Sequence, residues 1–142
     1  MMTPYEHLLV IRAAYERATD TVCKKHSIKH RELDILLFLH DYPNMSTATD
    51  IVKKQNLSKS HVSVSLRALE ERGFISGEFH GTNRRTIYLH LNDSASEVLS
   101  DAINARCEFA MAMVAGFTEE EKNGLGSYLG RVKKNLLSLS KK

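Results

Sequence analysis

The sequence predicts a mostly α-helical chain with one small β-hairpin, and two observations carry this prediction. The 142 residues include only 7 Gly and 2 Pro, and apolar residues recur at steps of three and four over most of the chain. The period changes to two only around residues 74–91, which contain the turn-forming run His80-Gly81-Thr82-Asn83. The length suits one compact unit, so we expect a single domain over 1–142.

Two helices are expected before the centre of the chain. Pro4 and an apolar stripe that continues to Val22 predict a helix over about 3–26. A second, mostly buried helix is expected over 31–40, where the sequence reads RELDILLFLH. This helix stops before Pro43, because proline cannot continue a helix.

Two shorter helices follow, each with its own start signal. The helix over 47–55 begins at a capping box, in which Thr47 and Asp50 satisfy each other's backbone amides. Ser58 is the N-cap of the next helix, which ends just before Gly73. Its apolar stripe consists of Val62, Leu66 and Leu69.

The last third of the chain predicts two long helices. The first is expected over 94–116, directly after the hairpin. The second begins at Thr118, followed by three glutamates in its first turn, and runs to about Leu139.

The two short helices and the tight turn between them form a helix-turn-helix, and the hairpin that follows makes it winged. A helix that enters the major groove needs short side chains for close approach and a few that reach base edges or phosphates. The exposed side of the second helix supplies both kinds: Ser58, Lys59, Ser60, His61, Ser63, Val64 and Arg67. The alternative is an ordinary solvated face with capping serines.

The net charge of +3 is concentrated in the centre of the chain. Residues 46–92 hold seven Lys and Arg against four Asp and Glu, and the flanking segments carry 13 of each sign. This distribution indicates a central part that faces a polyanion and two neutral structural arms.

The order and spacing of these motifs resemble the MarR family of winged-helix transcriptional regulators over nearly the whole chain. The resemblance rests on LSKSHVS at 57–63, LEERGFI at 69–75, NRR at 83–85 and LHLN at 89–92. It implies a winged helix-turn-helix core over 31–92 that binds double-stranded DNA, and long terminal helices over 1–30 and 93–142 that form a homodimer.

The resemblance also gives roles to the wing residues. Arg85 is expected in the minor groove, and Arg84 is a second candidate for phosphate contact. Asn83 stands where the family usually has Asp. A neutral amide can hydrogen-bond the Arg85 guanidinium but forms no charge-assisted pair, so we expect Arg85 to be less rigidly oriented.

The family's dimer interface implies a role for the apolar residues of the terminal arms, with packing inside one chain as the alternative. These residues are Tyr5, Leu8, Leu9, Leu125, Leu129, Val132, Leu136 and Leu137. We therefore expect a homodimeric, sequence-specific transcriptional regulator that reads a pseudo-palindromic operator. By resemblance it is a repressor relieved by a small-molecule effector. The chain lacks a membrane span and a signal peptide, which favours the cytoplasm.

Three hypotheses concern the effector. Cys23, His26 and His30 have a C-x2-H-x3-H spacing that could hold zinc, although ordinary surface histidines are the preferred interpretation and no cofactor is expected. A thiol sensor could use Cys107 or Cys23, whose pKa the neighbouring Lys24-Lys25 pair could lower. A small apolar or aromatic anion could bind in a pocket lined by Tyr15, Phe38 and Met111, although ordinary core packing is the preferred interpretation of these residues.

The sequence does not predict an enzyme. It lacks P-loop, GxSxG, HExxH and GxGxxG motifs, and its seven histidines are scattered. The remaining alternative is a winged helix that contacts an acidic protein instead of DNA.

Overall fold

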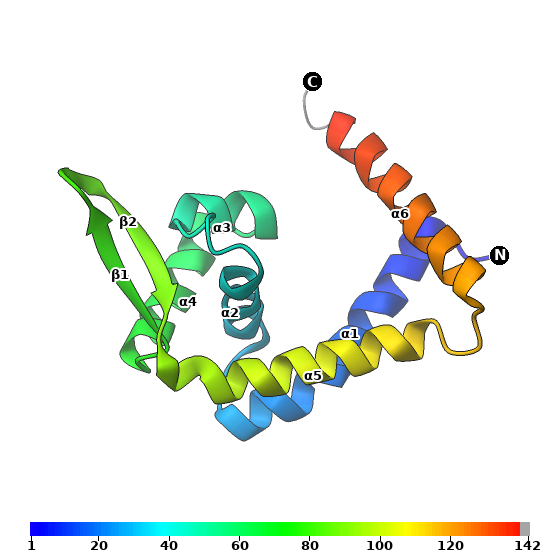
Figure 1. Cartoon of the computed structure of the whole chain (residues 1–142), viewed down its shortest axis with the longest axis horizontal. Helices are drawn as coiled ribbons and strands as arrows, with labels where there is room; N and C mark the ends of the chain where they lie inside the picture. The colour runs from blue at the N-terminus through cyan, green and yellow to red at the C-terminus, as the bar shows by residue number, and fades with distance from the viewer. Residues whose placement is uncertain (140–142) are drawn as a thin grey trace. The chain divides into compact units, whose positions relative to one another are not determined.

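A computed structural model describes residues 1–139, and the chain divides after Cys107 into two compact units. The last three residues of the predicted arm over 93–142 lie outside this description. The elements are α1 (Pro4–His26), α2 (His30–Asp41), α3 (Ala48–Gln55), α4 (Lys59–Glu71), β1 (Ile75–His80), β2 (Asn83–Leu91), η1 (Asp93–Ala95), α5 (Ser96–Met113) and α6 (Glu119–Leu139). Figure 1 labels all of them except η1. The expected mostly helical chain with one hairpin is confirmed.

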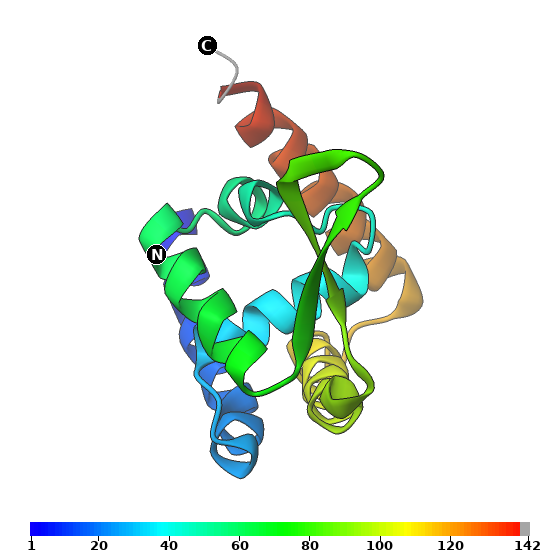
Figure 2. The ribbon, with the colours of Figure 1, turned by 90° about the vertical axis from the view of Figure 1, so that its left-hand side faces the viewer.

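The core of the first unit is built around α2. Its side chains from Ile35 to Leu39 are all buried, and it packs against α1, α4 and β2. Figure 2 shows α2 between α4 and the hairpin. A short helix can be this apolar because neighbours cover it on several sides.

The helix-turn-helix starts and stops at the residues that the sequence predicts. Thr47 Oγ1 accepts a hydrogen bond from the Asp50 amide at 3.1 Å, and Asp50 Oδ2 accepts one from the Thr47 amide at 3.2 Å. Asn56 ends α3 in the left-handed conformation with φ of 53°. Ser58 Oγ accepts from the His61 amide at 3.2 Å and begins α4, and Gly73 follows its end with φ of 75°.

The hairpin is antiparallel, with Ile75 paired to Leu91 at its base. The base is fixed to the rest of the winged helix-turn-helix core over 31–92, called the lobe below, because the Leu89 amide donates to the Ser46 carbonyl at 2.9 Å. A register shift between Glu78 and His80 lies near the tip. Such a bulge bends and twists the end of a hairpin.

The helix expected over 94–116 is shorter at both ends. Residues 93–95 form the 3₁₀ turn η1, in which Ser94 Oγ donates to the Gly73 carbonyl at 2.5 Å. After Met113 the chain leaves the helix through turns, and Gly116 has φ of 84°.

In the second unit, α6 begins as predicted. Thr118 Oγ1 accepts from the Glu121 amide at 3.1 Å, and the Thr118 amide donates to Glu121 Oε1 at 2.8 Å. α6 contains no buried residue in the described part of the chain. Among the described residues, no helix is long and apolar enough to cross a membrane.

Candidate nucleic-acid interface

Helix α4 separates its residues into a buried stripe and an exposed face. Val62, Leu66 and Leu69 are buried, and α4 packs against both α2 and α3. The predicted interface residues of this helix, together with its N-cap, are all exposed: Ser58, Lys59, Ser60, His61, Ser63, Val64 and Arg67. The buried stripe therefore fixes which side of α4 is presented to solvent.

The N-terminal end of this exposed face is rich in hydrogen-bonding groups. Ser58 Oγ lies 3.2 Å from Ser60 Oγ, next to the first turn of α4. The positive end of the helix dipole and the Lys59 ammonium add to the attraction for a phosphate at this end. The local geometry suits a close approach of α4 to an anionic backbone.

A groove of about 770 Å³ lies between α3 and α4. Its lining includes Lys53, Lys59 and Arg67 against a single acid, Glu70. The surface around α4 is therefore cationic, in agreement with the excess of positive charge in residues 46–92.

The C-terminal end of α4 is anchored by Arg72. The Arg72 guanidinium donates to the Ser27 carbonyl at 2.8 Å and to the His26 carbonyl at 2.7 Å. It also lies over the Phe74 ring at 4.8 Å from the ring centre. One side chain thus connects the end of α4 to the end of α1, through contacts that span 45 and 46 positions of the sequence and that no local sequence pattern indicates.

The wing presents Asn83, Arg84 and Arg85 in exposed positions. Asn83 Oδ1 accepts hydrogen bonds from the Arg85 amide at 2.9 Å and the Thr86 amide at 3.3 Å. From the sequence, the Asn83 amide could also hydrogen-bond the Arg85 guanidinium; in the structure its oxygen holds the backbone of the turn. A short side-chain acceptor next to a turn bonds the nearest backbone amides.

Aromatic side chains support the wing on either side of its tip. Arg84 lies over Phe79, with 5.4 Å between the guanidinium carbon and the ring centre. His80 stacks on Tyr88 with ring centres 3.8 Å apart and planes 4° apart. These contacts limit the conformations of Arg84 and stiffen an otherwise exposed hairpin.

Comparison with known proteins agrees with this geometry. The model of the MarR family matches residues 26–86, which include α2, α3, α4 and most of the wing. The HTH-type transcriptional regulator PecS of Dickeya dadantii is 29% identical over 125 residues, which cover 87% of this chain and 75% of PecS. Residues 26–86 of this chain are therefore similar to the MarR family.

The solved structures show the same fold. The crystal structure of MarR has a TM-score of 0.82 at 19% identity and covers 97% of this chain and 93% of its own. The structure of the Staphylococcus aureus MepR–DNA complex has a TM-score of 0.80 at 19% identity, with 95% and 99% covered. The similarity to these structures extends over nearly the whole chain and shows that the chain has the same fold.

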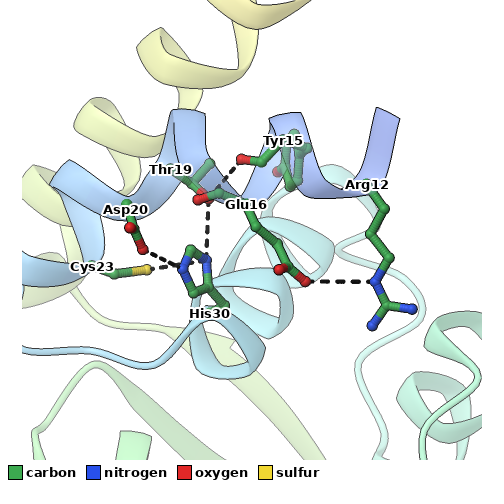
Figure 3. Close-up of polar contacts among 7 residues, drawn as sticks. All are labelled: Arg12, Tyr15, Glu16, Thr19, Asp20, Cys23 and His30. Carbon is green, nitrogen blue, oxygen red and sulfur yellow. Dashed lines mark hydrogen bonds and ion pairs between the residues drawn. The ribbon is translucent and has the colours of Figure 1, made fainter. Parts of the chain in front are cut away.

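The structure does not bring Cys23, His26 and His30 together as one set. His30 lies against α1 (Figure 3). Its Nε2 lies 2.8 Å from Asp20 Oδ1, and its Nδ1 lies 3.6 Å from Cys23 Sγ. The His26 ring turns instead to α5, where its Nε2 lies 2.7 Å from Asp101 Oδ2. Glu32, which lies near this set in the sequence, caps the N-terminus of α2 through the Lys29 amide. The sequence spacing did not reveal the turn after His26, where Ser27 has φ of 52°.

The expectation that Lys24 and Lys25 lower the pKa of Cys23 is wrong. Burial raises the pKa of the Cys23 thiol to about 11, and the nearby carboxylate of Asp20 adds to the effect. Both lysines are exposed, and Lys25 Nζ is held by Asp101 at 2.9 Å. Cys107 is exposed. Thiol chemistry at Cys23 is therefore suppressed, because the thiolate is the reactive form.

Two of the three residues expected to line an effector pocket do line a small cavity. Tyr15 and Phe38 border a space of about 190 Å³. The remaining lining residues are Asp34, Leu37, Asp41, Tyr42, Gln55 and Arg106. Met111 lies in the second unit with 71% of its surface exposed and is not part of this lining.

The titratable groups that line this cavity include an ion pair between Arg106 and Asp41 and two partly buried acids, Asp34 and Tyr15. Arg106 donates two hydrogen bonds to Asp41, at 2.7 and 3.1 Å, and these hold the pKa of the Asp41 carboxyl below its usual range. Burial raises the pKa of Asp34 and, with a contribution from Asp34, that of Tyr15. Since Arg106 is already paired with Asp41, the cavity suits a neutral or cationic ligand better than an aromatic anion, which was one of the possibilities that the sequence left open.

Proposed function

We propose that the chain is a homodimeric, sequence-specific transcriptional repressor that acts in the cytoplasm and binds a pseudo-palindromic operator in double-stranded DNA. The observation that carries the proposal is the exposed polar and cationic face of α4, followed by an arginine-tipped wing. The DNA complex of MepR, which shares the fold, supports DNA as the partner.

The residues of α4 and of the wing have different roles in this proposal. Ser60 and His61 near the start of α4 read base edges, with Ser63 and Val64 close enough for polar and methyl contacts. Lys59 and Arg67 neutralise phosphates. Asn83 shapes the wing tip so that Arg85 enters the minor groove, while Arg84 approaches the adjacent phosphates.

The proposed division of labour assigns DNA binding to residues 31–92 and dimerisation to the arms over 1–30 and 93–142. The support is the large exposed apolar surface of both arms. It includes Tyr5, Leu8 and Leu9 on α1, and Leu129, Val132 and Leu136 on α6. Exposed apolar surface of this extent is characteristic of a protein interface. A two-fold dimer would place two α4 helices about one DNA turn apart.

An effector is proposed to act by changing the spacing of the two α4 helices. A ligand can do so only if it binds one spacing more tightly than the other. The cavity beside Tyr15 and Phe38 suits such a ligand, because α1, α2, α3 and α5 all contribute to its lining. Its paired arginine and additional carboxyl group favour a neutral or cationic molecule.

The proposal is tested by selecting duplex DNA from a random library with the purified protein, with light scattering on the same sample. We expect a dimer that enriches a pseudo-palindromic sequence. If a dimer neutralises about eight phosphates, the logarithm of its affinity should fall with the logarithm of salt concentration at a slope near −7. Salt-sensitive binding without an enriched sequence would contradict specific recognition. If the protein does not bind DNA at all, an acidic protein partner becomes the favoured hypothesis.

Substitutions assign the roles within the interface. Arg85→Ala should weaken binding and reduce preference for AT-rich flanks, whereas Ser60→Ala or His61→Ala should change the selected bases at about 1–3 kcal/mol per base pair. The matched control is Arg31→Ala, which removes the same charge from an exposed position on α2. Equal specificity in all four proteins would show that α4 and the wing do not read the site.

A further inference from the structure

Three metal-binding side chains converge where the end of α1 meets the start of α5. His26, Glu97 and Asp101 each offer a ligand atom, and these atoms all lie within 4.8 Å of one another. Glu97 and Asp101 are four residues apart and therefore lie on the same face of α5. We propose that these three side chains form a binding site for a divalent transition-metal ion, with Zn²⁺ as its reference ligand.

The donor set has the chemistry that this class of ion requires. One imidazole nitrogen and two carboxylates suit Zn²⁺ and its neighbours in the first transition series, and three protein ligands leave a position for water. The two carboxylates balance the charge of the ion. The His26 side chain is only 12% exposed, so its ring is held in place before an ion arrives, whereas Glu97 is 75% exposed and can adjust.

Lys25 shows that the two carboxylates already converge on a cation. Its ammonium lies 2.9 Å from Asp101 Oδ2 and 3.5 Å from Glu97 Oε1. The Lys25 side chain is more than half exposed, and its flexible stem allows the ammonium to move into solvent. Metal binding is therefore a competition between the ion and a tethered ammonium, and removal of the ammonium should strengthen it.

The site is connected to the end of α4 through the backbone. The His26 carbonyl accepts from Arg72 at 2.7 Å, and Arg72 is the residue that ends α4. An ion that joins His26 to α5 would hold the carbonyl that anchors Arg72. We expect bound metal to raise the thermal stability of the protein, since it binds the folded arrangement and not the separated ligands.

The test uses the full chain without DNA, after dialysis against a chelator. Zn²⁺ is titrated in competition with a chromophoric chelator, and Co²⁺ is followed by its visible absorption. We expect one high-affinity equivalent per chain. His26→Gln and Asp101→Asn should remove it, and Glu97→Gln should weaken it by at least about tenfold, the lower limit for loss of even an outer-sphere partner. Lys25→Met should bind more tightly than the original chain.

Control variants distinguish binding at this site from adventitious binding elsewhere and from loss of the fold. His90→Gln removes an exposed imidazole on β2 and should leave metal affinity unchanged. Glu97→Gln alters a largely exposed side chain, so its effect cannot be attributed to unfolding, and circular dichroism checks the other variants. Original protein that binds Zn²⁺ no better than His26→Gln, or unchanged affinity in both Glu97→Gln and Lys25→Met, would overturn the proposal. Because no DNA is present, that failure leaves the proposed function untouched.

Discussion

The two halves of α1 lie in opposite environments, although they form one uninterrupted helix of 23 residues. In the first half Tyr5, Leu8 and Leu9 are exposed apolar side chains. In the second half Thr19, Val22 and Cys23 are buried against the lobe. The second half therefore belongs to the core of the first unit, whereas the first half exposes an apolar surface that suits a second protein surface.

Polar contacts explain why the second half is firmly attached. His30 at the start of α2 lies against Asp20, Thr19 and Cys23, as Figure 3 shows. Arg72 holds the last carbonyls of the same helix. A helix fixed in this way at one end connects its exposed end to α4. If the exposed end forms the proposed dimer interface, a change at that interface can therefore move α4.

The largest effect is expected from a charge placed on the exposed half. Leu8→Glu introduces a carboxylate at a side chain that is 61% exposed, so the fold of one chain should survive. If this face forms the dimer, light scattering should report monomers, and operator affinity should fall by about 10²- to 10⁴-fold because bivalent contact is lost. The matched control, Thr21→Glu, adds the same charge at an exposed position of the second half. Dimers in both variants would contradict the assignment of the first half of α1 to the dimer interface.

The burial of Cys23 in the second half of α1 predicts a slow reaction of its thiol. The pKa of Cys23 is raised from 9.0 to about 11, so near neutral pH its thiolate should be about 100-fold less populated than that of an ordinary cysteine. In a Cys107→Ser background, alkylation followed by mass spectrometry should be slower by at least this factor, and denaturant should abolish the difference. A fast reaction in the folded chain would show that the second half of α1 opens readily.

The same shift in the pKa of Cys23 gives a pH dependence of stability. The native state keeps the thiol proton after the unfolded chain has released it, so the free energy of unfolding is unaffected below pH 9.0 and falls as pH rises toward about 11. Urea unfolding on both sides of this range measures the change. Cys23→Ala should lose that part of the pH dependence, whereas Cys107→Ser should retain it.

Local signals in the sequence predicted the ends of most helices. The Thr47–Asp50 box, the Ser58 cap and Gly73 act within a few residues, and all occur where expected. The start of α5 was predicted too early, because Ser94 bonds the distant carbonyl of Gly73 and the chain forms a 3₁₀ turn there. Such a contact across the fold leaves no periodic pattern in the sequence.

The candidate sites likewise divide into those that depend on local sequence patterns and those that depend on contacts between distant residues. Exposure of the α4 face followed from its apolar stripe, since one periodic pattern fixes both sides of a helix. The Cys23, His26 and His30 spacing was misleading, because the chain turns after His26 and sends its ring toward Asp101, 75 residues away in the sequence. The link from Arg72 to the end of α1 is equally remote, at 45 and 46 residues.

A smaller effect is expected from weakening the contact between the second half of α1 and the end of α4. Arg72→Ala removes two charged hydrogen bonds to backbone carbonyls, so we expect a loss of about 2 kcal/mol in the free energy of unfolding by urea. Arg72→Lys should recover only part of it, because an ammonium lacks the planar fork that reaches both carbonyls. Arg67→Ala, on the exposed face of the same helix, should stay within about 0.5 kcal/mol. Equal stability of the Ala variants would remove Arg72 as an anchor.

The smallest effect compares one capping motif in two environments. Thr3 begins the exposed half of α1 with a capping box to Glu6, and Thr47 begins α3 with the equivalent box to Asp50. Replacement of either threonine by alanine removes a cap that contributes about 1 kcal/mol. Thr47→Ala should lower the free energy of global unfolding, because α3 packs against α4 in the lobe.

Thr3→Ala should leave global unfolding of the lobe nearly unchanged, because the first turns of α1 have no buried residue in the described chain. Its effect should appear instead as faster hydrogen exchange in those turns. If the exposed half is a dimer surface, the same variant should also dissociate more readily on dilution, since fraying of the turns that carry Tyr5 and Leu8 competes with their burial between chains. Equal loss of global stability in the two threonine variants would mean that the first half of α1 unfolds with the lobe, and the proposed division within this helix would be wrong.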